Sequence, residues 1–293
     1  MSTQIIDKNE IEQNDDEMDI VYKNNIPTIR SATHRVRYSN RKTQAGNPSK
    51  PNHKILDANT RFQMPEHLRT EFVLDYNAQI YNLREAVCKL LKAGDTSLLG
   101  KVTKSGLETL EIPPSSLLQK SVKQAQQTLS DSVVNSIEFL NLFDSLLLEV
   151  VLPDLKKRIG TSLPTTFWYQ RPPTLRLQPG PSRARVKPHA DCEYGHQDGE
   201  LNYWMPLTDS KLTQTCLWAE SEPGAGDFHP LESKVGQMNV FFGSYCKHYV
   251  PPNSTIYTRV SLDFRVGIPQ YGFDPDWQML GTTNDHTRRS VTL

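Results

Sequence analysis

The chain has 293 residues, enough for one large domain or two small ones with a sizeable buried core. Its 33 Lys and Arg residues equal its 33 Asp and Glu residues, so no overall charge draws it onto nucleic acid or an anionic membrane, and a small-molecule partner is expected. The four cysteines are widely spaced without a CxxC pair and no apolar signal segment opens the chain, which predicts reduced thiols and a cytoplasmic location.

Residues 1–54 are predicted to form a disordered polar tail. An acidic start is followed by a basic stretch from Arg30 to Lys54 that contains no acidic residue. Such a segment buries too little apolar surface to offset its chain entropy. The basic stretch also fits a nucleic-acid or targeting arm, but a targeting segment should begin the chain, and acidic residues do so here. We therefore favour a solvated tail, followed by a single domain over residues 55–293.

Residues 55–160 are predicted to form a helical scaffold. Apolar residues recur at helical spacing over residues 65–94 and again over residues 114–159, where an interruption is expected at Pro153 and an end at Gly160. The most apolar stretch of the chain, residues 139–153, is short and contains charged residues, so no membrane span is expected.

After residue 160 the pattern changes to short β-branched and aromatic runs separated by Pro, Gly, Asn and Asp, which is typical of a sandwich or barrel. These runs are TTFWYQ, TLRLQ, ARVKPHAD, LNYWMPLT, TCLWAE, QMNVFF and IYTRVSLDFRV. Helices followed by strands predict an α+β fold with the N-terminal helices packed outside a barrel. Residues 161–270 would form this barrel, a cupin-like jelly roll or double-stranded β-helix, and residues 271–293 a C-terminal tail or lid.

A candidate metal site lies within these strands. The outer side chains of His189-Ala190-Asp191 share one side if the segment is extended, because strand side chains alternate. The third ligand must come from elsewhere in the sheet, and the candidate is His248, which follows an apolar strand and precedes a turn. Two imidazoles and one carboxylate suit Fe(2+) and leave positions open for O2 and a chelating cosubstrate.

Two other ligand sets are consistent with the sequence. His196-Gln197-Asp198 is a second His-x-Asp, but glycines flank it and favour a turn, so we prefer the first pair. Cys192 and Cys246 each lie close to a histidine, which suggests zinc, although structural zinc uses four ligands in paired short spacings.

Arg259 and Ser261 form an Arg-x-Ser pair one strand after His248. On one strand face they form a carboxylate receptor, because the planar fork of arginine matches a carboxylate. Singly, a histidine near aromatic strands is more often a packed residue, and an Arg-x-Ser pair is more often a salt-bridged edge. Their joint occurrence at this spacing favours a functional site.

The order HxD, distal His and RxS, with the stretches YGHQDGELNYWMPLTD, ESEPGAGDFHPLE and TRVSLDFRV, resembles the Fe(II)/2-oxoglutarate-dependent dioxygenases over residues 165–269. It resembles in particular the streptomycin-biosynthesis-type and phytanoyl-CoA-hydroxylase-like enzymes. The resemblance implies that residues 55–293 form a catalytic domain using iron, 2-oxoglutarate and O2. It also implies residue roles: metal ligation by His189, Asp191 and His248, and cosubstrate binding by Arg259, Ser261 and, as a weaker candidate, Asn202.

The resemblance further implies an oxidoreductase of biosynthesis that oxidises an unactivated C–H bond of a small metabolite, by hydroxylation or by a kainoid-synthase-like oxidative cyclisation. Candidate contacts to a carboxylated, amino-acid-derived substrate are Arg176, Arg185, Lys187 and Tyr194. For the cations, a solvated hairpin is the alternative interpretation. A catalytically silent jelly-roll binding module and an oxygenase acting on a macromolecule remain alternatives for the whole chain.

Overall fold

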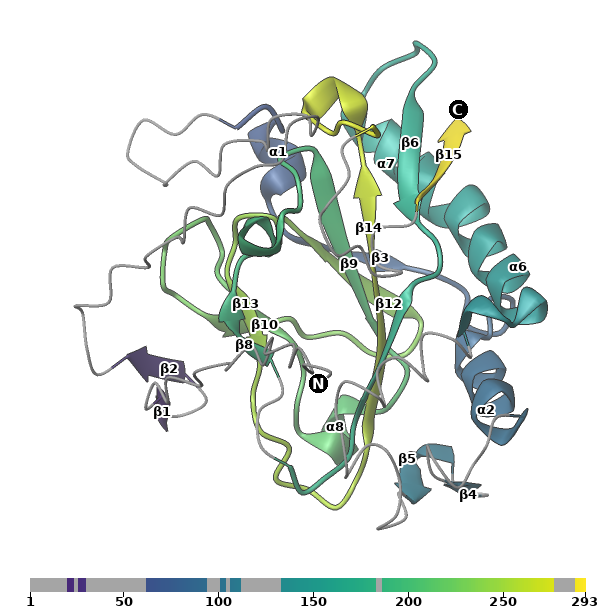
Figure 1. Cartoon of the computed structure of the whole chain (residues 1–293), viewed down its shortest axis with the longest axis vertical. Helices are drawn as coiled ribbons and strands as arrows, with labels where there is room; N and C mark the ends of the chain where they lie inside the picture. Colours follow the sequence, from purple (N-terminus) through teal and green to yellow (C-terminus); the bar gives the residue numbers. More distant parts are fainter. Residues whose placement is uncertain are drawn as a thin grey trace, which may run out of the picture. The chain divides into compact units, whose positions relative to one another are not determined.

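A computed structural model describes much of the chain (Figure 1). The described ranges are residues 20–23, 26–29, 62–93, 101–103, 106–111, 133–182, 186–276 and 288–293. The chain divides into two units, residues 1–42 and 43–293. In the first unit, strands β1 (Ile20–Lys23) and β2 (Ile26–Ile29) pair antiparallel. The rest of the predicted tail over residues 1–54 lies outside the described residues.

Two antiparallel sheets dominate the second unit. The larger is a seven-stranded sheet of order β15-β6-β14-β9-β12-β3, with β7 also paired to β14, and the smaller is a four-stranded sheet of order β11-β10-β13-β8. Among the described strands none belongs to both sheets, so their pairing gives a jelly-roll-like, two-layered arrangement and not the closed barrel we expected. The large sheet contains β3 (Phe72–Asp75), β6 (Thr166–Gln170), β7 (Thr174–Gln178), β9 (Glu200–Pro206), β12 (Gln237–Phe241), β14 (Arg259–Gly267) and β15 (Arg288–Thr292). The small sheet contains β8 (Val186–His189), β10 (Trp218–Ala219), β11 (His229–Pro230) and β13 (His248–Val250).

Strand β14 gives the large sheet two chemically different faces. Its apolar residues Val260, Leu262, Phe264 and Val266 are fully buried and alternate with polar residues, which therefore point to the opposite face. On the apolar face, the ring of Phe264 lies 5.1 Å from that of Phe143 in helix α6. Phe143 of α6 thus contacts the apolar face, and the polar side chains of β14 lie on the other face.

The prediction of one helix over residues 65–94 is wrong, because the middle of this range forms a strand. A short helix α1 (Glu66–Arg69) is followed by strand β3, which pairs with β12, and only then by helix α2 (Leu83–Ala93). The β-branched and aromatic residues of β3 suit a sheet edge. Helix α2 begins after Asn82, whose side chain accepts a hydrogen bond from the backbone N–H of Glu85.

The second helical block ends at Gly160, as predicted, but it is not interrupted at Pro153. Helix α6 (Ile137–Leu146), a five-residue π-helical turn (Leu147–Val151) and helix α7 (Leu152–Ile159) follow without a break, and Gly160 ends them with a φ of 72°. The π turn ends at Val151, two residues before Pro153, which has no N–H to donate, and the helix continues past the proline. Residues 114–132 of the predicted block lie outside the described residues.

Two further strand pairs differ from expectation. Within the predicted helical scaffold, β4 (Lys101–Thr103) and β5 (Gly106–Glu111) pair as a hairpin. Within the predicted tail or lid, β15 pairs along β6 and forms an edge of the large sheet. Arg288 and Arg289 of β15 bind carboxylates of Glu200 and Asp144, each at 2.6 Å. Within the described ranges, no helix combines the length and apolarity needed to cross a bilayer.

Replacing Phe143 tests the packing of α6 on the sheet. Phe143→Ala should lower the free energy of unfolding by about 3–5 kcal/mol, because a buried aromatic side chain leaves a cavity that the sheet fills only in part. Urea denaturation followed by circular dichroism measures this. The matched control is Ile137→Ala on the same helix, where the side chain is 74% exposed and a change within about 0.5 kcal/mol is expected. Equal effects of the two substitutions would contradict the packing.

Candidate metal centre

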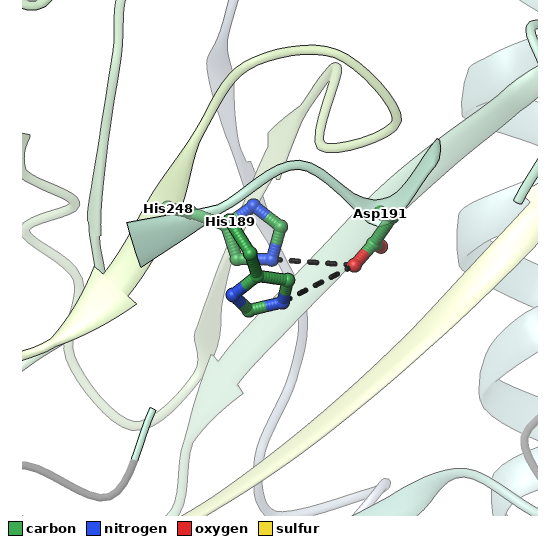
Figure 2. A group of neighbouring side chains, drawn as sticks. All are labelled: His189, Asp191 and His248. Carbon is green, nitrogen blue, oxygen red and sulfur yellow. Dashed lines mark ion pairs between the residues drawn. The ribbon is translucent and has the colours of Figure 1, made fainter. Parts of the chain in front are cut away.

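His189, Asp191 and His248 converge where β8 pairs with β13 (Figure 2). His189 ends β8 and lies opposite His248, the first residue of β13, so the two ring centroids are 4.5 Å apart. Asp191 opens the helical turn that follows β8, and its Oδ1 lies 3.6 Å from Nε2 of His189 and 3.5 Å from Nε2 of His248. These are the only described His, Cys, Asp or Glu residues grouped closely enough to hold an ion together.

The hydrogen bonds of the two imidazoles leave their Nε2 atoms as electron-pair donors. Nδ1 of His189 lies 2.7 Å from the carbonyl oxygen of Lys187, and Nδ1 of His248 lies 3.1 Å from that of Cys246. A carbonyl only accepts, so each Nδ1 carries the proton and each Nε2 is free to bind a metal. Burial lowers the pKa of His248 to about 4, against an opposing effect of Asp191, and keeps this ring neutral near pH 7.

The carboxylate of Asp191 is held through its other oxygen. Its Oδ2 accepts hydrogen bonds from Nδ2 of Asn202 at 2.6 Å and from Nε of Arg265 at 2.7 Å, while Oδ1 faces the imidazoles. Burial would raise the pKa of Asp191, but the opposing influence of its surroundings, above all the guanidinium of Arg265, holds the pKa well below its usual range. The residue is 2% exposed and ionised, with one oxygen directed at the candidate site.

Gly243 allows Asn202 to take this position. A Cβ atom on Gly243 would lie 2.5 Å from Cγ of Asn202, so only glycine permits the amide to pack against the backbone there. The carbonyl of Gly243 also accepts a hydrogen bond from the backbone N–H of Asp191. Nδ2 of Asn202 thus helps to orient Asp191, and a contact of Asn202 with a cosubstrate stays a prediction.

A cavity of about 450 Å³, including its open mouth, adjoins the two imidazoles. Arg259 lies on its wall, donating from Nε to Oε1 of Gln178 at 2.9 Å and from a terminal nitrogen to Oγ of Ser261 at 3.0 Å. The guanidinium is thereby fixed beside a hydroxyl, as the Arg-x-Ser spacing predicts. The other walls contain Arg176, Asn202, Asp263 and Arg265, and an apolar part formed by Trp204, Leu217, Phe241 and Val250.

The predicted substrate contacts divide into three groups. Arg176 lines the cavity, where it forms an ion pair with Asp263. Tyr194 is 61% exposed with its ring 5.2 Å from that of His189, and Lys187 is exposed; neither is among the cavity-lining residues. Arg185 lies outside the described residues.

The alternative pair His196 and Asp198 has other partners. Nδ1 of His196 lies 2.9 Å from a carboxylate oxygen of Glu200, and Asp198 accepts a hydrogen bond from the hydroxyl of Tyr245. The structure therefore brings together the first His-x-Asp and not the second. Cys192 and Cys246 do not belong to the metal-binding group among the described residues, and burial raises the pKa of each thiol to about 12.

Arg265 and Asp263 are site residues that our sequence interpretation missed. Both follow Arg259 and Ser261 at a period of two along β14, so they share the polar face of the strand. The signal was present in TRVSLDFRV, where charged and polar residues alternate with apolar ones. Their partners, Asp191 and Arg176, come from other strands and turns and have no such signal.

No protein-family profile matches the chain. Among curated proteins, it is 35% identical over 109 residues to the streptomycin biosynthesis protein StrG of Streptomyces griseus. The alignment covers 37% of this chain and 50% of StrG, so the chain spans about half the length of this relative. The resemblance to the streptomycin-biosynthesis-type proteins is thereby confirmed.

Several solved structures align with about 70% of the chain, at TM-scores below 0.5. The non-haem α-ketoglutarate-dependent epimerase SnoN from nogalamycin biosynthesis is 15% identical, with 68% of this chain and 78% of SnoN covered and a TM-score of 0.44. CytC3 with Fe(II) and α-ketoglutarate is 13% identical, with coverages of 72% and 80% and a TM-score of 0.42. The non-haem monooxygenase ThoJ in its nickel complex is 16% identical, with coverages of 70% and 76% and a TM-score of 0.43.

Arg265 should strengthen metal binding by His189, Asp191 and His248. Arg265→Gln is expected to weaken Fe(II) binding about 10- to 100-fold, the usual cost of losing a group that orients a ligand, because Oδ2 of Asp191 loses its charged partner. Anaerobic calorimetric titration measures the affinity. Arg84→Gln is the control, since it removes another arginine from a buried carboxylate, that of Glu108, and should leave Fe(II) binding unchanged. Equal Fe(II) affinity in wild type and Arg265→Gln would contradict this role.

Ionised Glu200 should stabilise the fold at neutral pH and lose this effect at acid pH. Burial would raise its pKa, but His196 and Arg288 outweigh burial and hold the pKa well below its usual range. The stabilisation by ionised Glu200 is therefore complete above the unfolded pKa of about 4.3 and is lost as the pH falls below it. Glu200→Gln should cost about 3 kcal/mol at pH 7 and flatten the decline of stability at acid pH.

Urea denaturation between neutral and acid pH tests this dependence. The control is Glu138→Gln, which breaks the exposed Lys89–Glu138 pair and should change the unfolding free energy by less than about 1 kcal/mol at any pH. If the unfolding free energy of Glu200→Gln falls with decreasing pH as steeply as that of the wild type, another carboxylate causes the pH dependence.

Proposed function

We propose that the protein is an Fe(II)/2-oxoglutarate-dependent oxygenase of small-molecule biosynthesis. The observation that carries the proposal is the convergence of two imidazole Nε2 atoms and one carboxylate oxygen beside a cavity that also contains a fixed guanidinium. A facial set of two histidines and one carboxylate is the ligand arrangement of non-haem iron oxygenases. The similarity to a streptomycin biosynthesis protein supports a role in specialised metabolism.

The donor chemistry fits ferrous iron. His189, Asp191 and His248 would hold the ion, through neutral imidazoles and a single carboxylate oxygen. Asn202 and Arg265 occupy the second oxygen of Asp191, which favours one bond from this carboxylate and leaves coordination positions for other ligands. The exposed side of the group opens into the cavity, so small molecules have access to those positions.

The cavity wall also fits 2-oxoglutarate. We assign the carboxylate remote from its keto group to Arg259 and Ser261, which offer a guanidinium and a hydroxyl within 3.0 Å of each other. Gln178 holds Nε of Arg259 and so fixes the plane of the guanidinium. A buried, pre-oriented arginine binds a carboxylate with little loss of side-chain entropy.

When bound, iron and 2-oxoglutarate supply the oxidation of an unactivated C–H bond by O2, with succinate and CO2 as products. The chain itself would position that bond and exclude water. Trp204, Leu217, Phe241 and Val250 form the apolar wall that does so, and the buried hydrogen bonds of Asp191 and His248 keep the ligands in place.

For the substrate we propose a small, carboxylated, amino-acid-derived metabolite, and for the reaction a hydroxylation or a kainoid-synthase-like oxidative cyclisation. The support is the cationic side chain of Arg176 on the wall of the cavity that adjoins the two imidazoles. Both reactions begin with removal of a hydrogen atom from carbon, and the same positioning of the C–H bond serves either.

Anaerobic titration with Fe(II) and 2-oxoglutarate tests the function. The wild type should develop the weak visible charge-transfer band of the iron-bound keto acid, and should release succinate when a substrate and O2 are supplied. His248→Ala should abolish the band, because a ligand is lost. Asp198→Ala, a change in the second His-x-Asp, should leave it intact.

The possible outcomes separate the alternatives. A wild type without the band would indicate a catalytically silent binding module. A band that survives His248→Ala and disappears with Asp198→Ala would mean that the iron ligands are assigned to the wrong residues. Thermal unfolding of each variant excludes loss of the fold as the cause.

A further inference from the structure

We propose that Arg176 and Asp263 together form a receptor for the charged groups of an amino-acid substrate, in which Arg176 binds the carboxylate and Asp263 binds the ammonium group. The inference rests on the proposed function and adds to it a required amine and the residue that recognises it. The substrate class is then an amino acid, or an amine-bearing derivative of one, with an apolar side chain.

The two residues form an ion pair on the cavity wall. Arg176 lies on β7 opposite Ser261 of β14, and Asp263 lies two residues further along β14, so both side chains occupy the polar face of the large sheet. Nε of Arg176 donates to one carboxylate oxygen of Asp263 at 2.6 Å, and a terminal nitrogen donates to the other at 3.0 Å. Positive and negative groups are thus presented side by side to the cavity.

The other charges of the cavity already have partners at the candidate iron and cosubstrate sites. Arg265 binds Asp191, and Arg259 is held by Gln178 and Ser261; all of these are buried. The side chains of Arg176 and Asp263 are 35% and 19% exposed, which puts this pair where an entering molecule meets the wall.

Asp263 has acceptor capacity for a cationic group. An ionised carboxylate offers about four lone-pair sites, and an ammonium group brings donors that need such acceptors. Among the residues the structure describes, the carboxylate of Asp263 has Arg176 as its polar partner, through one hydrogen bond to each oxygen. A zwitterionic head group matches both members of the pair, whereas a simple acid or a simple amine matches one.

The wall beside the pair is apolar. Trp204 of β9 lies opposite Asp263 of β14 in the sheet register, and Leu217, Phe241 and Val250 continue the cavity lining. These side chains belong to one buried hydrophobic cluster. A molecule whose charged end meets Arg176 and Asp263 therefore lays its hydrocarbon part along this cluster.

Calorimetric titration of the full chain, loaded anaerobically with Fe(II) and 2-oxoglutarate, tests the receptor. The probes are L-phenylalanine, 3-phenylpropanoate and phenethylamine, which share a ring and chain and differ only in the charged groups, and the leucine series built in the same way. The wild type should bind at least one amino acid about 10- to 100-fold more tightly than both of its analogues, since each analogue lacks one charge-assisted contact.

Two variants assign the groups. Asp263→Asn should bind the amino acid no more tightly than the acid that lacks the ammonium group, and should still prefer it to the amine. Arg176→Gln should bind the amino acid no more tightly than the amine that lacks the carboxylate, and should still prefer it to the acid. Asp263→Glu keeps the charge and should keep both preferences. The matched control is Asp154→Asn, which breaks an ion pair of similar exposure, 36% and 24%, between Arg158 and Asp154 on α7 and should leave every affinity unchanged.

Three results would contradict the proposed receptor. It fails if no amino acid is preferred by the wild type, if Asp263→Asn binds all probes as the wild type does, or if the variants weaken the charge-transfer titration with 2-oxoglutarate in place of probe binding. A wild type that shows no charge-transfer band contradicts the proposed function itself. A normal band without amino-acid preference contradicts only the receptor.

Discussion

The site depends on the way in which one carboxylate is held. Asp191 has an oxygen for each of two tasks: Oδ2 binds Arg265 and Asn202, and Oδ1 faces the two imidazoles. A buried carboxylate without such partners would take up a proton and lose its value as a ligand. The charge of Arg265 keeps Asp191 ionised, and the hydrogen bonds fix which oxygen is presented. The imidazoles are oriented in a similar way by backbone carbonyls, so the geometry exists before any ion arrives.

Strand β14 links this chemistry to the fold. One of its faces packs Phe264 against Phe143 of α6. The other carries Ser261 together with Arg259, Asp263 and Arg265, and these three charged residues line the cavity. Because the two sets alternate along one strand, a shift of register by a single residue would exchange them. Packing of the apolar face therefore fixes the positions of the charged groups, although the helix that provides it has no residue in the site.

The sequence predicts the local parts of this arrangement well. His189 and Asp191 lie two residues apart, at the end of one strand and the start of the turn that follows it, Arg259 and Ser261 are separated by one residue, and Gly160 ends a helix, so each feature involves residues close together in the sequence. What depends on pairing between distant segments was predicted poorly. Strand β3 was assigned to a helix because its apolar residues fit either period until β12 pairs with them. The bond from Arg265 to Asp191 and the pair of Arg176 with Asp263 follow from contacts between separate strands and turns, which no local pattern encodes.

The small sheet is built from short strands: β10 and β11 have two residues each, β13 three and β8 four. Strands of this length contribute few backbone hydrogen bonds, so this layer should open more readily than the large sheet. The candidate ligands from β8 and β13 sit where the edge strand β8 pairs with β13. An ion bound there would cross-link two segments that are far apart in the chain. Metal binding would then both complete the site and stabilise the small sheet against local unfolding.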